Sequence, residues 1–296
     1  MKRREMLISS GAALLGWSAF PLALARAGET KKQKVLYFTR SAGFQHPVVA
    51  RTGGKLSYSE VKFTEMCAEQ NVEVVCSKDG GVFDGDLSQY DAFAFYTSGV
   101  LTAEIQDAQH PQRAREEPPM TVSGKKRFFD AIAAGKGFLG FHATCDSFHS
   151  VGNKVSDFVA MLGGEFIVHG RPQEATMKVV SPKFPGVKGL GDSFKMNEEW
   201  YAMKNFAKDL HVILVQETEG MVDACYQRPP FPATWARMQG QGRVFYTSMG
   251  HFENVWTSPV FRQVVLGGLS WVLKRVDADV KSNVAQVTPQ ADQLKK

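Results

Sequence analysis

Three motifs that identify common enzyme classes are missing from this sequence. There is no G-x-S-x-G to present a serine nucleophile, no G-x-x-x-x-G-K-[ST] phosphate loop and no H-E-x-x-H zinc motif. The segment GKGFLG at 135–140 does match G-x-G-x-x-G. It enters a predicted strand, however, whereas the dinucleotide-binding motif follows a strand and opens a helix. A serine hydrolase, a phosphate-loop NTPase, a zincin and a Rossmann-type enzyme are therefore not expected.

Long hydrophobic runs are absent after the first 27 residues, so no later segment is expected to span a membrane. Residues 1–27 resemble an export signal, with the basic start KRR, an apolar stretch at 6–24 and Ala-Arg-Ala at 25–27. The twin arginine at 3–4 resembles a Tat signal, and Tat exports proteins that have already folded. We expect a periplasmic or otherwise exported protein. An uncleaved anchor is the alternative, which Ser9, Ser10 and Gly11 disfavour because they interrupt the apolar stretch.

The chain also has a small net charge and few cysteines. The net charge of the 296 residues is +5, of which residues 1–27 contribute +3. The rest forms no basic stripe that could hold a phosphate backbone, so nucleic acid is not an expected partner. The four cysteines are spaced like neither a compact disulfide framework nor a CxxC zinc site. Their disulfide state stays open: Cys67, Cys76, Cys145 and Cys225.

Apolar runs that do not alternate, separated by helical patterns, predict a parallel sheet with helices on both faces. We expect one doubly wound α/β domain at 34–274, after a linker at 28–33, with an antiparallel extension in the strand-rich region 165–217. Residues 103–121 predict an exposed insertion, and 275–296 a polar tail that frays. The expected strands are 34–39, 72–76, 91–97, 137–142, 165–169, 174–180, 210–217, 232–238 and 242–248, and the expected helices are 56–70, 123–134, 153–162 and 259–274.

Three histidines follow the carboxyl ends of predicted core strands. They are His46 in SAGFQHP, His142 at the end of GFLGFH, and His251 after VFYTSMG. The carboxyl ends of parallel strands meet at one crevice, so we expect these imidazoles to share a pocket, which His169 could join. Imidazole suits both proton transfer near neutral pH and binding of zinc or a similar divalent metal.

Other polar and aromatic residues are candidates for the same pocket. In NEEWY, a carboxylate beside aromatic side chains can serve as an acid or base, and aromatic faces suit sugars. The alternative is that the two glutamates lie on a solvated rim and the aromatics in the core. Arg237 could bind a polar substrate or simply form an ion pair. A local metal site within HATCDSFH is a further alternative. The candidates are Glu198, Glu199, Trp200, Tyr201, Trp235 and Arg237, and for the local site His142, Cys145, Asp146 and His149.

The order of five motifs resembles the ThuA-like family, which is named for trehalose utilisation. The motifs are GF-Q-HP, GKGFLGFHA, GGEFIVH, NEEWY and PATWARMQGQGRVFYTSMGH. The resemblance implies a flavodoxin-like core of the class I glutamine amidotransferase type and a role in sugar metabolism. Amidotransferase activity is not expected, because the family's fold relatives place a cysteine at the turn where His142 stands, and an imidazole cannot form the required thioester. The resemblance implies that the residues at the family's motif positions are, in this sequence, His46, His142, His169, Glu199, Tyr201, Arg237 and His251.

The sequence therefore favours an exported enzyme acting on a carbohydrate or an oxidised sugar. Whether it is a hydrolase, a lyase or an isomerase stays open, as does its oligomeric state. A non-catalytic periplasmic sugar-binding or accessory protein is the alternative. The expected acid–base groups or metal ligands are His46, His142, His251 and their partner Glu199, and the expected substrate-binding residues are Phe44, His169, Trp200, Tyr201, Trp235 and Arg237.

Overall fold

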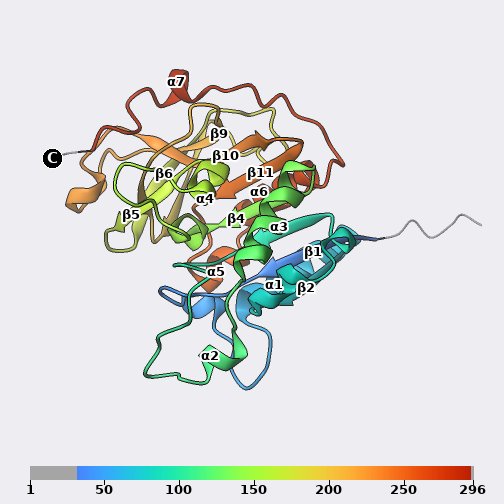
Figure 1. Ribbon diagram of the computed structural model, residues 1–296. Helices are drawn as coiled ribbons and strands as arrows, with labels where there is room; N and C mark the ends of the chain where they lie inside the picture. Colours follow the sequence, from blue (N-terminus) through green and yellow to red (C-terminus); the bar gives the residue numbers. More distant parts are fainter. Residues whose placement is uncertain (1–31, 295–296) are drawn as a thin grey trace, which may run out of the picture. The chain divides into compact units, whose positions relative to one another are not determined.

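A nine-stranded sheet runs through residues 32–294, the part of the chain that the computed structural model describes (Figure 1). Its order is β2-β1-β3-β4-β11-β10-β9-β6-β7. The first five strands are parallel, and the other four each run antiparallel to their neighbours. The strands are β1 (Gln33–Phe38), β2 (Val72–Ser77), β3 (Ala92–Phe95), β4 (Gly137–Phe141), β6 (Gln173–Val179), β7 (Ser193–Glu198), β9 (His211–Gln216), β10 (Phe231–Gln239) and β11 (Gly242–Thr247), with β5 (Glu165–His169) and β8 (Tyr201–Lys204) as a separate antiparallel pair.

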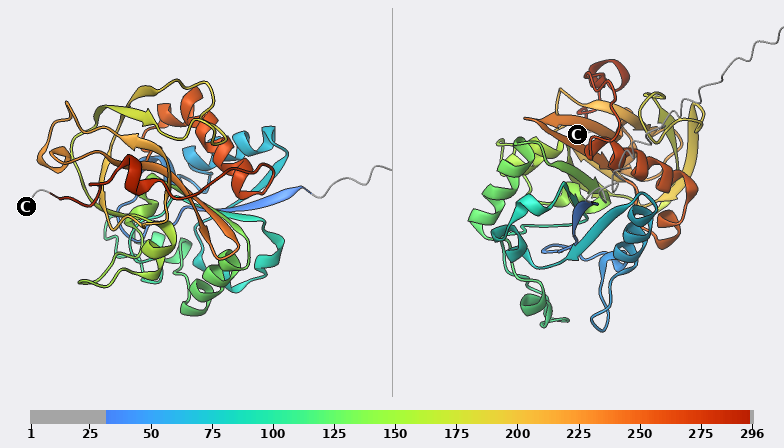
Figure 2. Two further views of the ribbon diagram at one scale, coloured as in Figure 1. Left: turned by 90° about the horizontal axis from the view of Figure 1, so that it is seen from above. Right: turned by 90° about the vertical axis from the view of Figure 1, so that its right-hand side faces the viewer.

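Helices cover both faces of the sheet, as the two further views in Figure 2 show. Helices α1, α5 and α6 contact one another, while α3 and α4 contact β11. Because both faces are covered, every residue of β3 and β4 is buried. The expected doubly wound α/β class is confirmed. The helices are α1 (Tyr58–Glu69), α2 (Arg113–Glu116), α3 (Val122–Ala133), α4 (Asp157–Leu162), α5 (Glu253–Trp256), α6 (Pro259–Val272) and α7 (Val284–Val287).

The start of α1 shows how the sequence sets a helix boundary. Ser57 and Glu60 form a capping box: the Ser57 hydroxyl accepts from the Glu60 amide, and the Glu60 carboxylate accepts from the Ser57 amide. The carboxylate is fully buried and also accepts from Arg51 at 2.8 Å and from the Thr39 hydroxyl at 2.6 Å. One glutamate thereby fixes the helix start to the loop that follows β1.

Several expectations about individual elements are wrong. The pattern at 123–134 predicts Phe129, Ile132 and Ala133 on the inward face, but in α3 Phe128 and Ile132 are buried, Phe129 is half-buried and Ala133 is exposed. Strands β7 and β8 were not expected, because β7 is a polar edge strand with a mostly exposed or half-buried pattern. The insertion 103–121 is not wholly exposed either, since Arg113 and Glu117 are buried in it.

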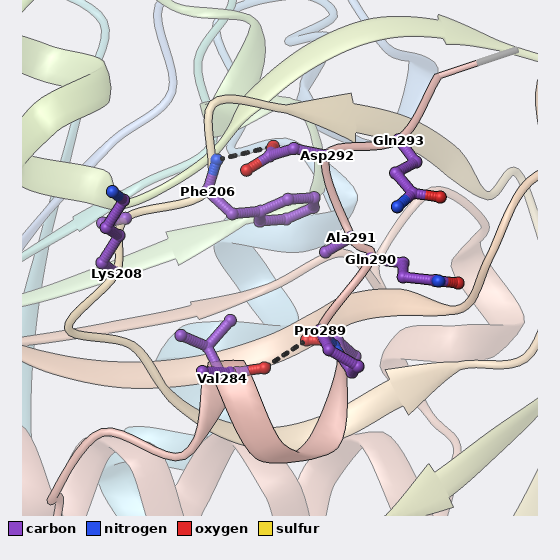
Figure 3. Close-up of a pocket in the computed structure, with 11 residues that line it drawn as sticks. Phe206, Lys208, Val284, Pro289, Gln290, Ala291, Asp292 and Gln293 are labelled. Carbon is purple, nitrogen blue, oxygen red and sulfur yellow. Dashed lines mark hydrogen bonds between the residues drawn. The ribbon is translucent and has the colours of Figure 1, made fainter.

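The tail after α6 is also unlike the fraying segment that we expected. The side-chain amide of Asn283 bonds to the backbone of Val212 in β9: its oxygen accepts from the Val212 N–H at 2.6 Å, and its NH₂ donates to the Val212 carbonyl at 3.0 Å. Asp292 then accepts from the Phe206 amide at 3.3 Å. Figure 3 shows the pocket of about 400 Å³ that the tail closes against Phe206 and Lys208. No histidine lines this pocket.

The predicted signal at 1–27 and most of the linker lie outside the described residues. No helix within residues 32–294 has the length and apolar character needed to cross a membrane. The four cysteines are free thiols, and Cys67 and Cys145 are buried.

Acidification tests the role of the buried Glu60. Burial raises the pKa of this carboxyl, but the hydrogen bonds from Arg51, Thr39 and Ser57 outweigh it and hold the pKa below its ordinary value. Its stabilising effect is therefore complete above the ordinary pKa of about 4.5 and is lost as the pH falls through the lowered value. In urea unfolding we expect Glu60→Gln to lose about 3 kcal/mol at pH 7 and to show a weaker acid dependence. Glu65→Gln, on the exposed face of α1, is the matched control, and equal behaviour of both variants would contradict this assignment.

Candidate functional site

The three histidines predicted at strand ends do meet, and Glu199 joins them. His46 lies in the loop after β1, His142 directly follows β4, His251 follows β11, and Glu199 lies between β7 and β8. One ligand atom from each of these residues lies within 4.8 Å of all the others. The predicted convergence is confirmed, and we call these four residues the histidine–glutamate group.

Glu199 is the centre of this group. Its Oε2 lies 3.0 Å from His251 Nδ1, 3.6 Å from His142 Nε2 and 3.8 Å from His46 Nε2. Its other oxygen, Oε1, lies 3.3 Å from Nδ1 of His169, at the end of β5. His142 is fully buried, whereas the His169 side chain is 44% exposed. The group therefore has a buried inner side and an accessible side at His169.

The position of His142 depends on an unusual backbone conformation. Its φ is +40°, in the left-handed region that side chains other than glycine rarely adopt. This turns the chain sharply at the end of β4 and directs the ring toward His251, with His142 Nε2 and His251 Nδ1 only 3.2 Å apart. On the other side of the ring, Nδ1 donates to the Ser248 carbonyl at 2.8 Å. That bond leaves the Nε2 lone pair facing the group.

A second carboxylate, Glu198, holds the loop that carries His251. It is fully buried and accepts hydrogen bonds from the backbone N–H groups of Glu199 (3.0 Å), Gly250 (2.9 Å) and His251 (3.1 Å). Burial raises the pKa of Glu198 to about 8, although these N–H groups oppose the shift. One side chain thus sets the positions of two members of the group. The sequence motif NEEWY pointed to both glutamates but could not show that their roles differ.

Electrostatics set the protonation state of the group. Burial lowers the pKa of His46, and it lowers the pKa of His142 to about 3, although Glu199 opposes both shifts. Burial raises the pKa of Glu199, but the three surrounding imidazoles outweigh it and hold the pKa far below its ordinary value. At neutral pH His46 and His142 are therefore neutral and Glu199 is a carboxylate, which is the state that metal binding requires of these three side chains.

The donor set fits a divalent metal such as zinc. Tetrahedral ligands at 2.0–2.1 Å from zinc lie about 3.4 Å apart, close to the 3.0–3.8 Å that separates Glu199 Oε2 from the three ring nitrogens, and all four ligand atoms lie within 4.8 Å of one another. His142 also has the usual outer contact of a metal-binding histidine, a ring N–H donated to a carbonyl. His46 lacks such a contact, because its buried Nδ1 has no partner among the described residues. The group can hold a metal, with three nitrogens and one carboxylate as ligands.

Aromatic rings surround the group on its open side. Phe44 is 66% exposed and lies edge-on to His46, with ring centroids 4.9 Å apart. Phe252 lies 4.4 Å from His251 in the same way, and Phe166 packs against Tyr201 at 4.3 Å. Tyr201 in turn contacts His46, with its hydroxyl 3.1 Å from Nε2. The sequence analysis missed Phe166 and Phe252, although each lies within three residues of a site histidine.

Three predicted substrate-binding residues lie elsewhere. Trp200 and Trp235 are fully buried, and their ring N–H groups donate to the carbonyls of Gln173 and Leu162. Arg237 donates to the Met161 carbonyl at 2.9 Å and to Asp209 at 3.0 Å. None of these hydrogen bonds involves a member of the histidine–glutamate group. Strand alternation places such residues on a face of the sheet but does not show which helix covers them.

The local metal site within HATCDSFH does not form either. Cys145 is buried against the Tyr246 hydroxyl at 3.0 Å, and burial raises the pKa of its thiol well above the ordinary value. His149 instead lies between Asp146 at 2.5 Å and Glu165 at 3.1 Å. The cysteine is thus far from the thiolate state that amidotransferase chemistry needs.

Comparison with known proteins identifies the family. The family model for ThuA, trehalose utilisation, matches residues 34–272. The chain is a member of the ThuA family. Solved ThuA-like proteins from Bacteroides uniformis and Parabacteroides merdae are 19% and 16% identical, with TM-scores of 0.61 and 0.62. These matches cover 83% and 85% of this chain and 94% and 95% of the solved chains, and at such identities they show the shared fold alone. None of the curated proteins matches the chain.

The buried Glu198 offers a test of how this ThuA protein builds its site. In Glu198→Gln an amide NH₂ would face backbone N–H groups, so the loop carrying His251 should shift. We expect zinc affinity to fall by about 10–100-fold, as when outer contacts of metal ligands are removed. Competition with a chromophoric chelator measures this affinity. Glu174→Gln, an exposed glutamate on β6, is the control, and unchanged affinity in Glu198→Gln would show that this carboxylate does not position the group.

Proposed function

We propose that this ThuA protein is an exported enzyme that acts on a carbohydrate or an oxidised sugar through a metal held by the histidine–glutamate group. The observation that carries the proposal is the meeting of His46, His142, Glu199 and His251, with their ligand atoms within 4.8 Å of one another. A structural role alone would not require three imidazoles and a carboxylate in contact at one partly open site. The aromatic rings at its opening support a sugar, since they offer apolar faces for C–H groups.

The residues of the site divide into two roles in this proposal. His46, His142, His251 and Glu199 hold the metal, which when bound polarises a substrate oxygen or lowers the pKa of a water. His169 is the candidate general base. Its Nδ1 donates to the Gly170 carbonyl at 2.9 Å, so its Nε2 keeps a lone pair that can accept a proton from the substrate.

Phe44 is the candidate stacking partner for the sugar. Its ring is 66% exposed although it lies against His46, so a ligand that reaches the metal ligands also reaches this ring. Amidotransferase activity is not part of the proposal. Cys145 is the only cysteine beside the site among the described residues, and it is only 1% exposed.

Metal removal and a paired substitution test the enzymatic role. We expect the purified protein to bind about one zinc or similar ion per chain, and a chelator to abolish turnover on a panel of sugars and keto-sugars. His251→Ala should lose most of the metal and at least about 100-fold in kcat/KM, while Phe44→Ala should keep the metal and chiefly raise KM. His110→Ala, on an exposed loop, is the control.

Tight sugar binding without turnover would instead favour the accessory role, and activity that survives metal removal would overturn the metal-dependent mechanism.

Export rests on residues 1–27 and has its own test. Replacement of Arg3 and Arg4 by lysine should keep the precursor inside the cell, because Tat recognition depends on the arginine pair. Fractionation of cells that express the full chain, with Lys2→Arg as the control, measures this. Normal export of the double variant would contradict the Tat assignment.

A further inference from the structure

A second polar cavity lies beside β1 and β2, away from the histidine–glutamate group. It has a volume of about 610 Å³, and no member of that group lines it. Its walls come from the loop at 50–54, from Lys78 just after β2, from the insertion that carries α2, and from Gln45, which directly precedes His46 in the chain. Both the loop and α2 lie at the lower edge of Figure 1. Neither the family assignment nor the proposed function gives this cavity a role.

Two of the cations at this cavity are already neutralised by carboxylates. Arg51 pairs with the buried Glu60 at 2.8 Å. Arg113 pairs with Glu117 at 3.1 Å and with Asp107 at 2.9 Å. These guanidinium groups therefore need no further anion for charge balance.

Lys78 is different. Its side chain is 4% exposed, and among the described residues its ammonium makes one hydrogen bond, to the Thr39 carbonyl at 2.7 Å. The nearest carboxylate oxygen, on Glu117, is 3.7 Å away, beyond hydrogen-bond distance, and it is already bonded to Arg113. An ammonium has three N–H donors, so two of them lack partners in the protein. Burial lowers the pKa of Lys78 to about 8 although Glu117 opposes the shift, which shows how incompletely the charge is compensated.

Other open donors line the same cavity. Gln112 has no side-chain hydrogen bond within residues 32–294, and the second terminal nitrogen of Arg51, Nη1, has none either. Gly53 and Gly54 form a turn with positive φ, and no atom lies within 4 Å of where their Cβ atoms would be. Glu116 is the one lining carboxylate that is exposed, at the opening of the cavity. The other lining carboxylate, Glu117, is buried and paired with Arg113. The buried Lys78 ammonium on the wall and the exposed Gln112 amide at the opening favour a small ligand with an anionic end.

We propose that this cavity binds a small oxyanion, a carboxylate or a phosphate group, with the Lys78 ammonium as its charged partner. The anion accepts hydrogen bonds from the two unpaired N–H groups of Lys78. Arg51 and Gln112 are the further donors within the cavity. Either a sugar acid or a phosphorylated small molecule offers this chemistry. No member of the histidine–glutamate group lines this site, so the two sites can be tested separately.

Calorimetric titration of the purified full chain tests this site, with inorganic phosphate as one probe, D-glucuronate as the second and D-glucose as the neutral control. We expect one or both anions to bind and glucose not to bind here. Lys78→Met should weaken anion binding by at least about tenfold, the loss expected for hydrogen bonds to a charged group. Gln112→Trp should do the same by filling the cavity from an exposed position. Lys126→Met, an exposed lysine on α3, and His251→Ala should both bind as the wild type does.

The outcomes separate this inference from the proposed enzymatic role. Binding that is lost in Lys78→Met and Gln112→Trp but kept in His251→Ala supports the second site. If Lys78→Met fails to fold, the Gln112→Trp result decides. Absence of binding for both anions, or anion binding that neither variant weakens, would overturn the inference. So would anion binding that disappears in His251→Ala, since the probes would then be reporting the histidine–glutamate group.

Discussion

One carboxylate, Glu199, lies in contact with imidazoles from four separate segments of the chain. His46, His142 and His251 reach its Oε2, and His169 reaches its Oε1. Burial disfavours a charge on His46 and His142, so these two imidazoles stay neutral and the Glu199 carboxylate carries the charge. That distribution of charge favours a cation in the centre. The rest of the site, from the strained backbone at His142 to the buried Glu198, serves to keep these groups together.

The sheet is divided between two kinds of strand pairing, and the site uses both. The parallel half places His46, His142 and His251 at the carboxyl ends of its strands, where ligands of doubly wound folds bind. The carboxylate comes from the link between β7 and β8, which belongs to the antiparallel part. A doubly wound fold alone would therefore supply the imidazoles without their common partner.

The histidines could be found from the sequence because their signal is topological. A histidine directly after an apolar strand, as His142 is after GFLGF, will lie at the ligand-binding edge if the strand is parallel. The contributions of Glu198 and Glu199 could not be separated in this way. The two are adjacent at the end of an edge strand, so one turns toward the backbone of the loop at 250–251 and the other toward the imidazoles. Trp235 and Arg237 were misplaced because their partners, the last carbonyls of α4, come from a helix about 75 positions earlier.

The distribution of the site along the sequence has a consequence for biosynthesis. The first member of the group is residue 46 and the last is residue 251, within a chain of 296. A ribosome that has synthesised the chain through α4 but not yet through β11 has produced an incomplete group, because His251 is still missing, as are the Gly250 and His251 amides that bind Glu198. Capture of the metal that we propose for this group would then be coupled to completion of the fold, since the ligands become neighbours only when both halves of the sheet have assembled. Quality control can in this way act on loading and folding as a single event.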